Sequence, residues 1–135
     1  MDPLRKGYIM SERIFILDDD ETTLTIIKNI LESNRLKVST FSSPNKLIDK
    51  LKIKVPRLIL LDIMMPDIDG LSLCKEIRKL DGYGEIPIVI LSSKISAMHK
   101  REAFQVGASG FITKPFTARE LVFAIKTYMD LPKII

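Results

Sequence analysis

Short apolar runs and helical patterns alternate five times along this sequence of 135 residues. One of the runs, Leu58–Leu61, is apolar at every position, as expected for a strand that is covered on both faces. Strands that alternate with helices form parallel sheets, because each helix returns the chain in a right-handed crossover. We therefore expect an α/β fold: a doubly wound (βα)5 domain with a five-stranded parallel sheet and helices on both of its faces.

The positions of the expected elements follow from apolar periodicity and turn residues. We expect strands at residues 13–17, 37–41, 58–61, 88–91 and 110–113. We expect a first helix that opens at Asp20 or Glu21 and stops at Asn34, and a second that begins at Pro44 and includes Leu51. We expect three more helices at about residues 71–80, 98–106 and 117–129. Ser43 before Pro44 is typical of a helix N-cap followed by a first-turn proline. We expect Asp20 to be the N-cap or a first-turn acid of the first helix rather than to bind a ligand.

The length of the chain predicts one domain, at residues 13–130, between an N-terminal extension (1–12) and a C-terminal tail (131–135). Its 46% hydrophobic and 28% charged residues are typical of a globular protein. The apolar runs are far shorter than the roughly 20 residues that cross a bilayer, and the first residues do not resemble a signal peptide. We expect a cytoplasmic protein without a membrane partner.

The chain has one cysteine, Cys74, and one histidine, His99. It therefore offers no intrachain disulfide, no zinc site and no Cys–His catalytic pair. We expect Cys74 to be buried as a small apolar residue and His99 to lie on the surface. The net charge of +4 comes from scattered Lys and Arg residues without interleaved aromatic residues, so we expect no direct nucleic-acid partner.

Four of the five expected strands end in polar or charged residues. These residues are Asp18, Asp19 and Asp20 after the first strand, Asp62 after the third, Ser92 and Ser93 after the fourth, and Lys114 after the fifth. In a doubly wound sheet, ligands bind beyond the carboxyl ends of the strands. The sequence therefore predicts that carboxylates, a hydroxyl and an ammonium group meet at one edge of the sheet.

The chemistry of these groups indicates a site that accepts a phosphoryl group. Carboxylates held within a few ångströms repel one another, and a divalent cation removes that cost. Mg²⁺ prefers oxygen ligands and neutralises charge during phosphoryl transfer. An aspartate can itself be the nucleophile and form an aspartyl phosphate, and a lysine ammonium suits a phosphate oxygen. We therefore expect Mg²⁺ as the cofactor.

Four motifs carry a resemblance to a known family. They are ILDDDE (16–21), LLDIMMPDIDG (60–70), IPIVILSS (86–93) and GASGFITKPF (107–116). In this order, each at an expected strand end, they resemble the receiver domain of bacterial two-component response regulators, also called CheY-like. The resemblance covers about Arg13 to Met129 and implies a flavodoxin-like fold with strand order 2-1-3-4-5.

The resemblance also implies a role for each matching residue at the metal and phosphoryl site. Asp62 matches the aspartate that is phosphorylated and that shares the Mg²⁺ ion. Asp19 matches the carboxylate that binds Mg²⁺ directly, and Asp18 matches its partner, which acts largely through water. The backbone carbonyl of Met64 matches the third ligand that the protein supplies.

A second group of matching residues belongs to the switch. Ser92 matches the switch hydroxyl, Lys114 the phosphate-binding lysine and Phe111 the aromatic switch residue. The bond before Pro115 would be cis by resemblance, and X–Pro is the bond at which cis costs little. Ser93 departs from the alanine that is common after the hydroxyl residue.

The function that the resemblance implies is a phosphorylation-dependent signalling switch rather than a conventional enzyme. A sensor histidine kinase or a histidine phosphotransfer protein would donate the phosphoryl group to Asp62. The surface made by the fourth helix (98–106), the fifth strand (110–113) and the fifth helix (117–129) would then change and control a downstream output protein or domain. That surface is also where a homodimer could form.

Two alternatives and one structural expectation stay open at this point. A haloacid-dehalogenase-type phosphatase would use Asp18 as its nucleophile, because Asp18-x-Asp20 superficially fits that family. A receiver-like fold could also serve as an interaction module that works without phosphorylation.

Gly70 is expected to serve a turn that needs a positive φ. No output domain is expected within this sequence, which leaves open whether it is a freestanding receiver or part of a longer protein.

Overall fold

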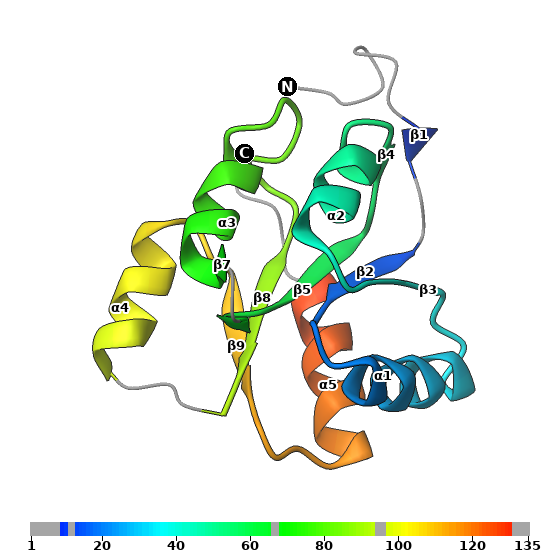
Figure 1. Cartoon of the computed structure of the whole chain (residues 1–135). Helices are drawn as coiled ribbons and strands as arrows, with labels where there is room; N and C mark the ends of the chain where they lie inside the picture. The colour runs from blue at the N-terminus through cyan, green and yellow to red at the C-terminus, as the bar shows by residue number, and fades with distance from the viewer. Residues whose placement is uncertain (1–8, 11–12, 66–67, 94–96, 131–135) are drawn as a thin grey trace.

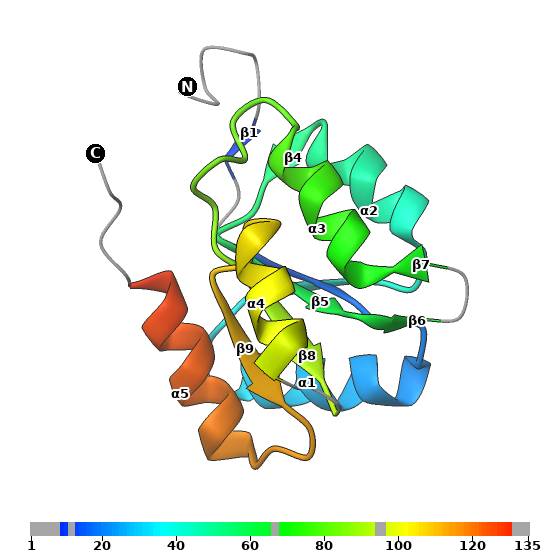
Figure 2. The same cartoon turned by 90° about the vertical axis from the view of Figure 1, so that its left-hand side faces the viewer.

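A central parallel sheet lies between two layers of helices in the computed structural model of the chain (Figure 1). The structure describes residues 9–10, 13–65, 68–93 and 97–130. Helices α1 (Glu21–Ser33) and α5 (Ala118–Met129) cover one face of the sheet. Helices α2 (Pro44–Leu51), α3 (Gly70–Arg78) and α4 (Ala97–Gln105) cover the other, as Figure 2 shows.

The main sheet has the strand order that the sequence predicts. Its strands are β2 (Ile14–Leu17), β3 (Val38–Phe41), β5 (Leu58–Asp62), β8 (Ile88–Ser92) and β9 (Gly110–Thr113). They are parallel and lie in the order β3-β2-β5-β8-β9. Counted among the five strands alone, this is the order 2-1-3-4-5. The α/β, flavodoxin-like fold class is therefore confirmed.

The sheet separates two apolar cores, because side chains alternate between the faces of a strand. In β8, Ile88 and Ile90 pack in the core beneath α2, α3 and α4, whereas Val89 and Leu91 pack in the core beneath α1 and α5. Every residue of β2, β5 and β8 is buried. This explains the continuous apolar runs in the sequence and confirms that both faces are covered. Cys74 is fully buried in the first core, as expected.

Local capping interactions fix where several helices begin. Asp20 is the N-cap of α1 and accepts a hydrogen bond from Thr22 N, which confirms its expected role. Thr117 and Glu120 form a reciprocal capping box at the start of α5. Ser43 occupies the N-cap position of α2, but its side chain makes no capping hydrogen bond. The first-turn Pro44, rather than the Ser43 hydroxyl, therefore marks this helix start.

Two small strand pairs were not predicted. Strand β1 (Ile9–Met10) pairs in parallel with β4 (Lys54–Val55), although residues 9–10 were expected within an extension. Strands β6 (Met64–Met65) and β7 (Ile68–Asp69) pair antiparallel within the loop after β5. Pairs of two residues have no periodicity to read, so the sequence gives no signal for them.

Gly70 corrects one expectation. It is the first residue of α3 and is absent from the residues with positive φ in the described chain, which include Gly82 and Gly107. A Cβ atom at Gly70 would lie 2.9 Å from the carbonyl oxygen of Asp62 and closer still to the Cα atom of Ile63. Gly70 is therefore needed because α3 begins directly against the end of β5, and not because a turn requires a left-handed backbone.

Across the residues that the structure describes, no helix is both long enough and apolar enough to span a bilayer.

Candidate phosphoryl-accepting site

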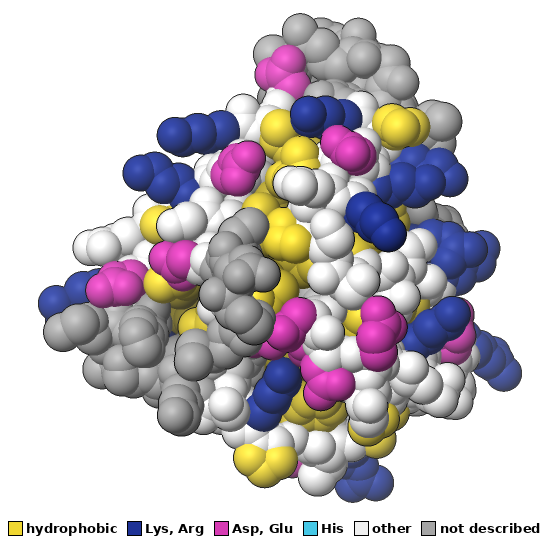
Figure 3. Space-filling view, in the orientation of Figure 1, with side chains coloured by type: hydrophobic (Ala, Val, Ile, Leu, Met, Phe, Trp, Pro, Cys, Tyr) yellow, Lys and Arg dark blue, Asp and Glu magenta, His cyan; other side chains and the backbone are white. Residues whose placement is uncertain are grey.

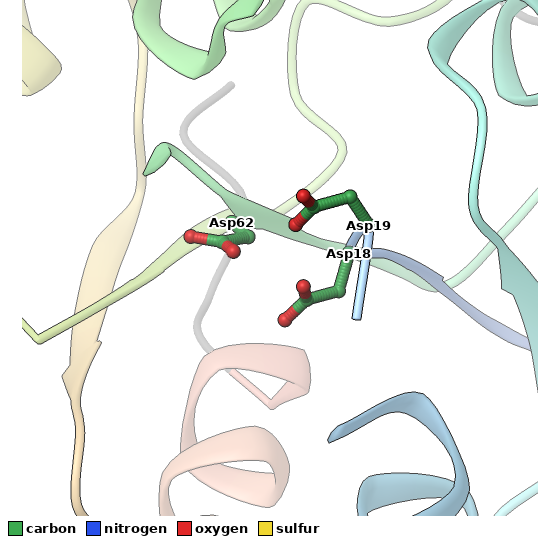
Figure 4. Close-up of side chains that lie close together, drawn as sticks. All are labelled: Asp18, Asp19 and Asp62. Carbon is green, nitrogen blue, oxygen red and sulfur yellow. The ribbon is translucent and has the colours of Figure 1, made fainter. Parts of the chain in front are cut away.

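Three aspartates meet at the carboxyl end of the sheet. Asp18 and Asp19 directly follow β2, and Asp62 is the last residue of the neighbouring strand β5. Leu17 is paired with Leu61, so the next residue of each strand emerges at the same edge. The three side chains each offer a carboxylate oxygen, and these oxygens all lie within 4.8 Å of one another (Figure 4). Figure 3 shows acidic side chains gathered where β2 leads into α1.

Lys114 brings a positive charge to this cluster from the far edge of the sheet. It directly follows β9, and its backbone N–H donates to the carbonyl of Ser92 at 2.9 Å. Its Nζ lies 3.3 Å from Asp18 Oδ2 and 3.7 Å from Asp62 Oδ2. The expected meeting of strand-end carboxylates with Lys114 is therefore present in the structure.

The electrostatics of Asp18 favour a further cation. The residue is fully buried, and burial is the main cause that raises the pKa of its carboxyl group above the usual 3.8. The charge of Asp62 raises the pKa further, while the backbone N–H of Asp20 and the charge of Lys114 lower it. One ammonium group thus only partly offsets the cost of burying this carboxylate beside a second one.

Asp20 takes no part in the cluster. Its carboxylate accepts hydrogen bonds from Thr23 Oγ1 at 2.8 Å and from Thr22 N at 3.0 Å. Both hydrogen bonds lower the pKa of the Asp20 carboxyl group, and the bond from the Thr23 hydroxyl lowers it most. The first two aspartates of the run therefore face the cluster, and the third caps α1.

Ser92 and Phe111 lie on the same face of the sheet. Ser92 ends β8, is buried, and is paired with Thr113 in the register of β8 and β9. It follows Ile88 and Ile90 in the alternation that faces α3 and α4, and Phe111 packs half-buried against that same core. Phe111 lies two residues before Thr113, so its side chain lies one pleat away from Ser92 along the neighbouring strand.

Two further predicted positions are found near the cluster. The Lys114–Pro115 peptide bond is cis, the isomer that the resemblance implies. Met64 lies in β6, two residues beyond Asp62, with its backbone paired to Asp69; its side chain and that of His99 lie outside the described part of the structure. Asp69 in turn caps α3 by accepting a hydrogen bond from Leu71 N.

Sequence reasoning missed the residues that surround Phe111. The ring of Phe104, in α4, contacts the ring of Phe111 edge to face, and Lys100 Nζ lies 6.0 Å from the centre of the Phe111 ring. The hydroxyl of Tyr128, in α5, accepts a hydrogen bond from the backbone N–H of Phe111 at 3.3 Å. Lys100 and Phe104 are four residues apart, so an expected helix puts them on one face, but nothing in the sequence places that face against Phe111.

A family model for the response regulator receiver domain matches residues 14–126 of the chain. The chain belongs to the response regulator receiver domain family. The matched range includes every strand of the main sheet and the aspartate cluster with Lys114. Receiver domains are signalling modules of two-component systems and are not conventional enzymes.

Relatives and solved structures agree with this assignment. The chain is 32% identical over 125 residues to the alkaline phosphatase synthesis transcriptional regulatory protein PhoP of Bacillus subtilis; the match covers 93% of the chain and 51% of PhoP. The chain thus spans about half the length of this relative. A CheY-like receiver domain protein of Methanospirillum hungatei is 28% identical, with a TM-score of 0.81 over 88% of this chain and 94% of that one.

Chemotaxis protein CheY4 of Vibrio cholerae supports the fold alone. It is 23% identical, with a TM-score of 0.82 over 90% of this chain and 98% of that one.

Membership of the receiver family sets the phosphatase alternative aside. That alternative would have used Asp18 as its nucleophile.

Proposed function

We propose that this receiver domain, residues 13–130, is a switch that is phosphorylated on Asp62. The observation that carries the proposal is the position of the Asp62 carboxylate, 3.7 Å from a lysine ammonium and within 4.8 Å of two further carboxylates. A sensor histidine kinase or a histidine phosphotransfer protein is the proposed donor, and the cytoplasm the proposed location. A downstream protein or domain is the proposed output.

Phosphoryl transfer at this site requires little from the chain beyond a nucleophile and well-placed charge. A carboxylate oxygen of Asp62 forms the new bond to phosphorus while the bond from phosphorus to the donor imidazole nitrogen breaks. That nitrogen keeps the electron pair. Lys114, which already lies beside Asp62, can form an ion pair with an oxygen of the incoming phosphoryl group and stabilise its negative charge.

The donor set fits Mg²⁺. Asp18, Asp19 and Asp62 offer carboxylate oxygens within 4.8 Å of one another. The proposed direct ligands are Asp19, Asp62 and the backbone carbonyl of Met64, with Asp18 acting largely through water. A buried carboxylate with a raised pKa gains most from a nearby cation. When bound, Mg²⁺ would neutralise the charge that develops on the transferring phosphoryl oxygens.

The proposed response begins at Ser92. A phosphoryl group on Asp62 adds acceptor oxygens and charge, to which the Ser92 hydroxyl can donate a hydrogen bond. Phe111, one pleat away on the same face, can then turn toward the space near Ser92 and change the surface formed by α4, β9 and α5. A coupling of about 1–3 kcal/mol would change the affinity of an output partner roughly 5- to 150-fold.

A titration with beryllofluoride, a phosphoryl mimic, tests the proposal. Wild-type protein with Mg²⁺ should bind the mimic stoichiometrically, and chelation of Mg²⁺ or the substitution Asp62→Asn should abolish binding. A wild-type protein that binds neither Mg²⁺ nor beryllofluoride would instead favour an interaction module that works without phosphorylation. The surface of α4, β9 and α5 is also the proposed site of a homodimer. Sedimentation that shows only monomers at all concentrations of the mimic would exclude this dimer.

A further inference from the structure

The ring of Phe111 is held by two side chains of α4. The ring centres of Phe104 and Phe111 lie 5.0 Å apart, and the planes meet at 81°, which is a favourable edge-to-face arrangement. Lys100 Nζ lies 6.0 Å from the centre of the Phe111 ring, at the outer limit of a cation–π contact. Lys100 and Phe104 are four residues apart and share one face of the helix. We call this pair the α4 clasp.

The clasp holds the ring toward the end of α4 that is remote from Ser92. The chain leaves β8 at Ser92 and soon enters α4 at Ala97, whereas Phe104 is the next-to-last residue of that helix. At 1.5 Å per residue, Phe104 lies about 10 Å along the helix axis from Ala97. A Phe111 ring that turned toward Ser92 would therefore have to leave Phe104.

Few of the described side chains of α4 are buried against the rest of the domain. Of its described side chains at residues 100–105, Ala103 alone is buried, and Phe104 is 56% exposed. The loop after α4 is fixed by Arg78, whose Nε donates to the carbonyl of Gly107 at 2.8 Å. An element with little buried apolar surface and one fixed end can move at low cost. Figures 1 and 2 show α4 beside β9, and the contact of Phe104 with Phe111 joins these two elements.

We propose that Phe104, assisted by Lys100, is a positioning residue that holds Phe111 away from Ser92 and so sets how readily the switch turns. The inference rests on the proposed function, in which Phe111 turns toward Ser92 on phosphorylation. Losing one aromatic pair changes an equilibrium constant about 2- to 12-fold. A ligand that binds the turned form better then gains apparent affinity by at most the same factor.

Beryllofluoride affinity in the presence of Mg²⁺ tests this inference directly. The variant Phe104→Leu should lower the dissociation constant about 2- to 12-fold, and Phe104→Tyr, which keeps the ring, should retain the wild-type value. Lys100→Met should shift affinity in the same direction by a smaller factor. The matched control is Ile26→Ala, because Ile26 is 50% exposed on α1, outside the surface of α4, β9 and α5; it should leave the affinity unchanged.

A double variant separates positioning from general damage to the fold. In a Phe111→Ala background, adding Phe104→Leu should no longer change the affinity, because the ring that is held has been removed. Unchanged or weakened binding in Phe104→Leu would overturn the inference, as would a gain that persists without the Phe111 ring. A wild-type protein that does not bind beryllofluoride would overturn the proposed function itself, so the two failures are distinct.

Discussion

Lys114 Nζ lies 3.3 Å from Asp18 Oδ2, although 96 positions separate the two residues in the sequence. The contact joins the carboxyl end of β2 to that of β9, across the two strands between them. Asp62 lies within the same arrangement, 3.7 Å from the ammonium group. The fold thus builds the site from residues that are remote in the chain and share only their place at a strand end.

Replacement of Lys114 should slow phosphoryl uptake. In Lys114→Met, Asp62 would receive the phosphoryl group without the neighbouring ammonium, and a hydrogen bond to a charged group is worth about 1.5–3 kcal/mol. Uptake from acetyl phosphate at saturating Mg²⁺ should be about 10- to 150-fold slower, as followed by intact mass. Lys126→Met, on the exposed face of α5, is the control. A wild-type rate in Lys114→Met would show that the ammonium does not act on the phosphoryl group.

Protein stability should depend on pH through Asp18. Its pKa is raised, mainly by burial, so the folded state binds this proton more tightly than the unfolded state does. Without Mg²⁺, its contribution to stability should therefore fall as the pH rises from about 3.8 through the folded-state pKa. Added Mg²⁺ should restore stability above that range, because the cation replaces the proton.

Thermal unfolding between about pH 4 and pH 8, with Mg²⁺ or with a chelator, measures this dependence. Asp18→Asn should flatten the loss of stability with rising pH. Asp20→Asn should not flatten it, because the pKa of Asp20 is lowered and its contribution is lost instead as the pH falls. The same loss of stability in Asp18→Asn as in the wild type would assign the effect to another group.

Gly70→Ala should destabilise the protein and disturb Asp62. The new Cβ atom would lie 2.9 Å from the Asp62 carbonyl oxygen, and overpacking of this kind costs about 1–3 kcal/mol. Gly84→Ala is the matched control, because nothing lies within 4 Å of a Cβ atom there. Chemical denaturation should show a loss for the first variant and a change within about 0.5 kcal/mol for the second. Equal stability of the two variants would contradict the close approach of α3 to β5.

Arg78→Met should destabilise the protein without removing a catalytic group. The guanidinium donates to the carbonyls of Tyr83, Ile86 and Gly107 and to Ser109 Oγ. Losing these donors should cost about 2–4 kcal/mol, since buried carbonyls would lose their partners. Lys75→Met, on the exposed side of α3, should cost little. A loss below about 0.5 kcal/mol in Arg78→Met would show that water replaces these bonds.

The sequence predicted the buried strands, which depend on apolar periodicity, and the site residues that stand at strand ends. The apolar runs fixed β5, β8 and β9 to within a residue, because buried parallel strands tolerate few polar side chains. The position of Asp18, Asp62 and Lys114 at strand ends likewise predicted that the three side chains lie close together. The sequence did not predict the β6–β7 pair, the true reason for Gly70, or the contact of Phe104 with Phe111. Each of these depends on the packing of one element against another, for which a single sequence has no local signal.

Intact mass after treatment with acetyl phosphate and Mg²⁺ tests the central claim most directly. The wild-type chain should gain one phosphoryl group, mapped to Asp62, and Asp62→Asn should gain none. Full uptake by Asp62→Asn, or a phosphoryl group mapped to Asp18 in the wild type, would contradict the account.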